Sequence, residues 1–134
     1  MKLMNMPPTK KTRRRPKNPM RKASKISLRL YYGNEIALGP GKADLLEAIK
    51  KTGSIAAASR SMDMSYKRAW SLVETMNACF RAPLVETVKG GAARGGADLT
   101  PLGEETLRRY RKMQSSANAA LRRDMAKLKS LLAE

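Results

Sequence analysis

Ser54 and Ser65 each stand directly before a stretch whose composition favours a helix. Serine is a preferred N-cap because its side-chain oxygen accepts a hydrogen bond from a backbone N–H of the first turn. The first stretch covers residues 55–62 and contains three consecutive alanines, which let another helix approach closely. The second runs from Ser65 to about Phe80. Two capped helices joined by only a few residues predict a helix-turn-helix unit.

The segments before this unit add a small strand pair and a further helix. Residues 26–32 alternate apolar and polar side chains, the pattern of a half-buried strand, and Gly33 and Asn34 predict a turn into a return strand over residues 35–38. A helix follows and ends at Thr52–Gly53, since glycine favours the end of a helix. Its apolar stripe consists of Leu45, Leu46, Ala48 and Ile49.

A glycine-rich hairpin is predicted after the helix-turn-helix unit. Pro83 prevents simple continuation of the helix, residues 84–88 have the composition of a strand, and residues 98–100 return as its partner. The tip, residues 89–97, lacks the spacing of a phosphate-binding loop. Such a hairpin is the wing of a winged helix-turn-helix. The fold class is therefore mainly α with a small β component.

The last predicted helix is capped by Thr100 and extends to about Leu132. A helix of about 30 residues reaches about 45 Å, longer than the small body it leaves. We expect a second copy of the chain to cover its far end, giving a homodimer; the alternative is that the helix folds back on its own domain. The predicted dimerisation residues are Tyr110, Met113, Ala117, Leu121, Met125, Leu128 and Leu132.

Charge is distributed unevenly along the chain. Its 28 Lys and Arg against 11 Asp and Glu give a formal net charge of +17, which favours a polyanionic partner. Residues 1–25 hold ten basic side chains and no acid, and the other 109 residues carry a net +7. With four prolines, this segment is predicted to be a disordered basic arm. It is either a solubilising tail or an arm along DNA phosphates or in a minor groove.

The helix that begins at Ser65 divides into two faces when its residues are projected at 100° per residue. Ala69 and the residues around it, with Tyr66 at the edge, form an apolar face, and Lys67 and Ser71 lie opposite. The outer face starts basic and becomes acidic at Glu74, which suits a helix that enters the major groove by its N-terminal end. The alternative is a merely solvated charged face. Predicted DNA-binding residues are Ser54, Ser65, Tyr66, Lys67, Arg68, Ser71, Lys89 and Arg94.

Two residues near this face, Trp70 and Cys79, have less defined roles. The composition also disfavours disulfide, metal and catalytic sites. Trp70 either packs beside the first helix or lends its ring and indole N–H to the interface, and Cys79 is expected in the core. One cysteine and no histidine provide neither a disulfide within the chain nor a metal site of the usual kind. We expect neither an enzyme nor a cofactor. Without an apolar run of about 20 residues or a secretory signal, a cytoplasmic location is expected.

A series of runs in this chain resembles a known family. They are Gly39-Pro40-Gly41-Lys42, Leu45-Leu46-Glu47-Ala48-Ile49, Gly53-Ser54-Ile55-Ala56-Ala57-Ala58, Met64-Ser65-Tyr66-Lys67-Arg68-Ala69-Trp70, Met76-Asn77, Pro83-Leu84-Val85-Glu86-Thr87 and Leu99-Thr100-Pro101-Leu102-Gly103. Over about residues 26–115 they resemble the N-terminal DNA-binding domain of ModE-type molybdate-responsive regulators, and more distantly the LysR-type winged helix. The resemblance implies a homodimer formed through long helices, with one recognition helix and one wing per half-site.

Family members that sense molybdate do so in C-terminal β-rich domains, whereas this sequence ends on the long helix, so we expect no small-molecule effector site in it. We expect a disordered arm (1–25), a winged helix-turn-helix domain (26–100) and a dimerisation helix (101–134). The leading hypothesis is a regulator of transcription that binds double-stranded DNA sequence-specifically without its own molybdate-binding domain. The alternatives are a nucleoid-type architectural protein with little sequence preference, and a winged helix that binds protein or RNA.

Overall fold

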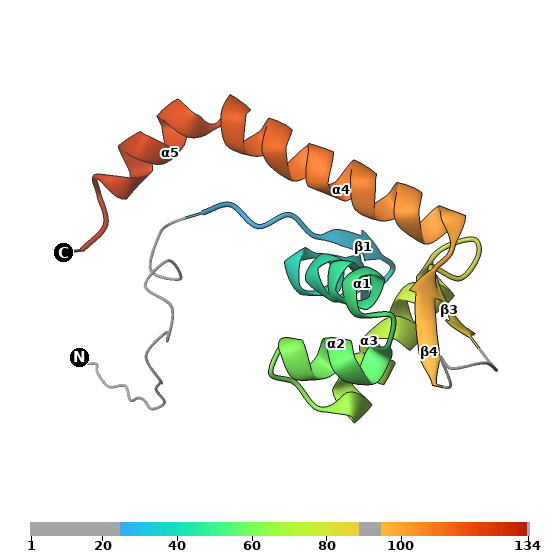
Figure 1. Cartoon of the computed structure of the whole chain (residues 1–134). Coiled ribbons are helices and arrows are strands. Elements are labelled where there is room, and N and C mark those ends of the chain that lie inside the picture. The colour runs from blue at the N-terminus through green and yellow to red at the C-terminus, as the bar shows by residue number, and fades with distance from the viewer. Residues whose placement is uncertain (1–24, 89–94, 134) are drawn as a thin grey trace, which may run out of the picture. The chain divides into compact units, whose positions relative to one another are not determined.

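The computed structural model describes residues 25–88 and 95–133 and confirms the predicted fold class. A domain over residues 26–122 holds two antiparallel strand pairs and most of the helices (Figure 1). Its elements, in chain order, are β1 (Leu30–Tyr32), β2 (Glu35–Leu38), α1 (Pro40–Thr52), α2 (Ile55–Ser61), α3 (Tyr66–Cys79), β3 (Val85–Val88), β4 (Gly96–Leu99) and α4 (Pro101–Ala120). A separate C-terminal segment carries most of α5 (Arg122–Lys129).

The first strand is shorter than predicted. Only Leu30–Tyr32 form β1, and all three side chains are exposed, although Ile26 and Leu28 are half-buried as the alternation suggested. Leu30 pairs with Leu38, the last residue of β2, so residues 26–29 have no partner strand. The carbonyl oxygen of Leu28 instead accepts a hydrogen bond of 2.7 Å from the Tyr110 hydroxyl on α4. The predicted turn at Gly33–Asn34 is present.

The core forms around α1, which lies between α4 on one side and α2 with α3 on the other (Figure 1). Leu45, Leu46 and Ile49, three of the four residues of the predicted stripe, are fully buried. Val73 and Met76 of α3 and Leu84 before β3 complete the centre of the cluster. Helix α1 is capped at its C-terminal end by Gly53, whose φ of 74° is a conformation that glycine adopts without steric cost.

All three predicted N-caps have the expected hydrogen bonds. The side-chain oxygens of Ser54, Ser65 and Thr100 accept from the backbone N–H groups of Ala57, Arg68 and Gly103 at 2.9, 3.0 and 3.0 Å. The predicted bounds of α2 and α3 are each correct to within about a residue at the C-terminal end. The caps therefore fix where the two helices of the helix-turn-helix begin.

The predicted hairpin is present, with a return strand that starts earlier than expected. β3 and β4 pair from Val85 with Leu99 to Val88 with Gly96, whereas Thr100 leaves the sheet and caps α4. Lys89 and Arg94, the two predicted contacts at the tip, lie outside the described residues, as does the predicted basic arm apart from Lys25.

The first half of α4 belongs to the domain. Arg111 bonds Asp44 and Glu47 of α1 at 2.9 and 2.6 Å, and Lys50 pairs with Glu104 at 2.8 Å. The hydrogen bond to Arg111 is the main cause that lowers the pKa of Glu47. These ion pairs hold α4 along α1.

The long helix predicted over residues 101–132 is two helices in the structure. α4 ends at Ala120, and Leu121, with φ −104° and ψ 9°, separates it from α5. The side chains of residues 118–124 are all exposed, and in α5 only Met125 is half-buried. Packing of an apolar face supplies most of a helix's stability. Residues 118–124 lack such packing, so little stabilises a continuous helix through this segment. No helix in the described ranges has the length and apolar content to span a membrane.

Candidate nucleic-acid interface

The two faces predicted for α3 are confirmed. Ala69, Val73 and Met76 are buried against the rest of the domain, whereas Lys67 and Ser71 on the opposite side are exposed. Glu74 and Ala78 are exposed on the same outer side, and Leu72 and Phe80 are half-buried. The outer face is therefore basic near its start and acidic near its middle, as the sequence indicated.

The first turn of α3 exposes a run of polar and basic side chains. Ser65, Lys67 and Arg68 are all exposed, and the Ser65 hydroxyl also caps the helix. Tyr66, projected at the edge of the apolar face, is instead 52% exposed. Its ring meets that of Trp70 edge to face, with centroids 6.3 Å apart and an interplanar angle of 84°. Trp70 is half-buried and packs against the core, so the exposed Tyr66 ring contacts a side chain that is itself fixed in place.

The turn between α2 and α3 contains a backbone conformation that the sequence reading did not single out. Asp63 has a φ of 58°, which aspartate tolerates better than most non-glycine residues. The backbone N–H of Met64 donates to the carbonyl of Ser59 at 3.0 Å, which closes the turn. This turn sets the angle between α2 and α3, and an aspartate directly after a predicted helix was its signal in the sequence.

Ser54 is placed differently from the other predicted contacts. It is half-buried, and its hydroxyl oxygen accepts from Ala57 N–H. Its carbonyl accepts from the Thr52 hydroxyl at 3.0 Å. Its observed interactions are therefore those of a helix cap.

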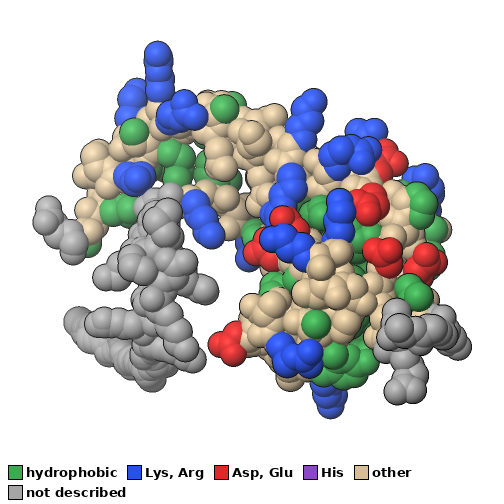
Figure 2. Space-filling view, viewed as in Figure 1, with side chains coloured by type: hydrophobic (Ala, Val, Ile, Leu, Met, Phe, Trp, Pro, Cys, Tyr) green, Lys and Arg blue, Asp and Glu red, His purple; other side chains and the backbone are tan. Residues whose placement is uncertain are grey.

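The ion pairs of the domain involve side chains of α1 and α4. The ion pairs in the described residues join α1 to α4 or lie within α4, and none includes Lys67 or Arg68. Burial is the main cause that lowers the pKa of Lys42 on α1, and the nearby Arg68 charge acts in the same direction. In Figure 2, Lys and Arg side chains protrude at the lower end of the domain, where α2 and α3 lie. The cations of α3 are thus available to an anionic partner.

The base of the hairpin is fixed to α3 by a side chain that sequence reasoning missed. Asn77 Oδ1 accepts from the backbone N–H groups of Leu84 and Val85 at 2.8 and 3.2 Å, and its Nδ2 donates to the Val85 carbonyl at 3.2 Å. From the other side, Thr100 donates through its backbone N–H to Leu84 and through its hydroxyl to Pro83, at 2.9 and 2.7 Å. The strand that starts the wing is therefore held on both sides.

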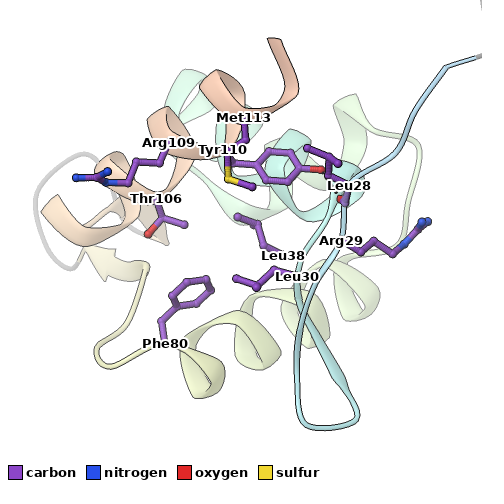
Figure 3. A pocket seen from close by; sticks show the side chains of 9 residues that line it. All are labelled: Leu28, Arg29, Leu30, Leu38, Phe80, Thr106, Arg109, Tyr110 and Met113. Carbon is purple, nitrogen blue, oxygen red and sulfur yellow. Dashed lines mark hydrogen bonds between the residues drawn. The ribbon is translucent and has the colours of Figure 1, made fainter. Parts of the chain in front are cut away.

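An apolar hollow of about 340 Å³ opens between residues 28–30, α4 and the end of α3 (Figure 3). Leu28, Leu38 and Phe80 line it, with Tyr110 and Met113 of α4 above them. The side chain of Arg109 points away from the hollow in Figure 3 and pairs with Glu105 at 2.8 Å. The hollow is thus bounded by hydrophobic side chains of the domain's surface.

The predicted dimerisation residues do not all lie on a free surface. Met113 is 55% exposed, and Leu121, Leu128 and Leu132 are also exposed. Ala117 and Met125 are half-buried. Tyr110 is only 3% exposed, because it packs in the core of its own domain and bonds Leu28. Its place in a dimer interface stays a prediction, since periodicity identifies an apolar face without showing which surface covers it.

Cys79, expected in the core, is half-buried at the end of α3. Within residues 25–88 and 95–133, no group of three or more His, Cys, Asp or Glu side chains is placed to hold a metal ion.

Curated proteins from several bacteria are similar to this chain. The molybdenum-pterin-binding protein MopB of Rhodobacter capsulatus is 48% identical over 73 residues, which are 54% of this chain and 27% of MopB. The transcriptional regulator ModE of Yersinia pestis is 35% identical over 113 residues, 82% of this chain and 43% of the relative. The DNA-binding transcriptional dual regulator ModE of Escherichia coli K12 is 34% identical over 87 residues, 65% of this chain and 33% of the relative.

This chain therefore spans less than half the length of each of these relatives. No protein-family model matches it. Among solved structures, the crystal structure of the CbnR_DBD–DNA complex shares the fold with a TM-score of 0.53 at 20% identity, covering 66% of this chain and 95% of that one. The chain has the fold of a winged helix-turn-helix domain, and its sequence is similar to parts of ModE and Mop proteins.

Proposed function

We propose that the chain is a transcriptional regulator that binds double-stranded DNA sequence-specifically and reads the major groove with α3. The carrying observation is the first turn of α3, which is capped by Ser65 and exposes Lys67 and Arg68 without an acidic partner in the described residues. The regulators to which the chain is similar, and the DNA complex that shares its fold, support the proposal.

The geometry suits entry of α3 by its N-terminal end. The major groove of B-DNA is about 12 Å wide and admits one α-helix. Arg68 is the side chain best suited to base readout, because a guanidinium donates two hydrogen bonds to the O6 and N7 atoms of guanine. Lys67 and the hydroxyls of Ser65 and Ser71 reach phosphates or base edges nearby. Glu74 marks the end of the contact, since its carboxylate is repelled by the phosphates.

The functional unit is a homodimer. Met113 is exposed at the edge of the apolar hollow, Leu121 is exposed after the last residue of α4, and Leu128 is exposed in α5 of the separate C-terminal segment. Covering these side chains with the same surface of a second copy satisfies two-fold symmetry. Two recognition helices related in this way read half-sites about one helical turn, or about 34 Å, apart, or a multiple of that. The proposal assigns no molybdate site to residues 26–122.

Replacing Arg68 by alanine is expected to weaken binding to each half-site about tenfold, because each protomer loses one bidentate base contact. The cognate duplex is obtained by enriching random double-stranded DNA with the full chain. Affinity is then measured by gel-shift titration at about 150 mM salt.

Arg108→Ala is the matched control, because this exposed arginine lies on α4 and its removal changes the net charge equally. The control is expected to bind nearly as well as the parent protein. Equal losses from the two variants would indicate general electrostatic attraction, as in an architectural protein, and would refute the assignment of α3 as the reading helix.

A further inference from the structure

We infer that Asn77 is a positioning residue that locks the wing to the recognition helix, so that both bind DNA as one unit. This inference rests on the proposed DNA-binding function. It concerns the last turn of α3 and the start of β3, which Asn77 joins by three hydrogen bonds.

The hydrogen bonds determine how the amide must lie. Two backbone N–H groups, those of Leu84 and Val85, point at Oδ1, and only the carbonyl oxygen of the amide can accept them. The amide nitrogen then faces the Val85 carbonyl and donates to it. The oxygen and the nitrogen of the amide are thus both bonded to the backbone of two consecutive residues, which fixes the start of β3 relative to α3.

The two anchored residues are buried and the hydrogen bonds to them are part-buried, so water compensates only partly for the loss of these bonds. Leu84 is fully buried and Val85 is 4% exposed. A buried N–H group without an acceptor loses its hydration without compensation. An apolar side chain in place of Asn77 therefore forces the segment before β3 to move to find other partners. Thr100 still holds Pro83 and Leu84 from the other side, so the hairpin stays attached while its hydrogen-bonded link to α3 is lost.

The hydrogen bonds of Asn77 matter for binding because the two proposed DNA-binding elements, the start of α3 and the β3–β4 hairpin, lie apart. Lys67 and Arg68 lie in the first turn of α3, whereas Asn77 lies near the end of the helix, beside the hairpin. A helix in the major groove and a hairpin on the adjacent backbone bind together only if their relative position matches the DNA. Asn77 provides that preorganisation, which reduces the cost of ordering the wing on binding.

The test is a double-mutant cycle between Asn77→Leu and a wing variant, Lys89→Ala with Arg94→Ala. Affinities for the selected duplex are measured at fixed salt on full chains shown to be folded by circular dichroism. In the parent protein, the wing variant is expected to lose about tenfold in affinity. In the Asn77→Leu background, which itself loses about tenfold, it is expected to lose less than twofold.

Two further variants separate positioning from stability alone. Asn77→Asp still accepts both N–H bonds, but its second carboxylate oxygen replaces the donor beside the Val85 carbonyl, so its affinity is expected to lie between those of the parent and Asn77→Leu. Asn118→Leu makes the same change at an exposed position of α4 and is expected to have no effect.

Three outcomes would overturn the inference. The first is that the wing variant loses affinity equally in both backgrounds, with Asn77→Leu lowering only the melting temperature. The second is that Asn77→Asp binds as weakly as Asn77→Leu. The third is that the wing variant binds as well as the parent while Arg68→Ala still loses affinity, which removes the wing's role and leaves the proposed reading by α3 intact. If Arg68→Ala also has no effect, the proposed function itself fails.

Discussion

Replacing Gly103 by alanine is expected to lower the free energy of unfolding by about 3 kcal/mol, the upper part of the range for overpacking. Gly103 is buried in the first turn of α4. A Cβ there would overlap the carbonyl oxygen of Leu84 and stand 3.0 Å from its carbonyl carbon. Because the obstacle is backbone held by Asn77 and Thr100, it cannot rotate away as a side chain would.

Gly41→Ala is the control for this prediction. Gly41 also lies in the first turn of a helix, α1, and a Cβ there would meet nothing within 4 Å. Alanine has the higher helix propensity, so this variant is expected to be as stable as the parent or slightly more stable. Urea unfolding followed by circular dichroism measures both. Equal stability of the two variants would mean that α4 does not pack on Leu84 as described.

Replacing Met113 by glutamate is expected to convert the proposed dimer to a monomer and to weaken binding to a duplex with two half-sites about 100-fold. A buried carboxylate without a partner is costly at an interface. Linking two binding modules raises affinity by about 10² to 10⁴, and the monomer loses that gain. Because Met113 is 55% exposed in the single chain, the fold should tolerate the change. Sedimentation equilibrium gives the assembly state and gel-shift titration gives the affinity.

Ser115→Glu adds the same charge at an exposed position on another face of α4 and should leave both the dimer and its affinity unchanged. A Met113→Glu variant that remains dimeric would place the interface elsewhere.

Features that depend on local chemistry were predictable from the sequence. The caps at Ser54, Ser65 and Thr100 were identified because a hydroxyl bonds a backbone N–H only three residues along the chain. The buried and exposed faces of α3 followed from helical periodicity in the same way.

Features that depend on distant partners were missed or misread. Asn77 was not recognised, because its partners at Leu84 and Val85 are brought to it only by the reversal of the chain after α3. The extent of β1 was overestimated, because alternation does not show whether a partner strand exists. Tyr110 was predicted in a dimer interface because its spacing continues the stripe of α4, and that spacing did not reveal that its hydroxyl bonds Leu28 of the same domain.

Specific recognition by α3 is the central claim, and comparison of two duplexes tests it most directly. The full chain is used to enrich random double-stranded DNA, and its affinities for the enriched duplex and for a shuffled duplex of equal composition are measured at about 150 mM salt. We predict enrichment of two-fold related half-sites and a preference of about 1,000-fold or more. Affinities within a few-fold of each other, falling equally steeply with salt, would contradict sequence-specific reading and indicate an architectural protein.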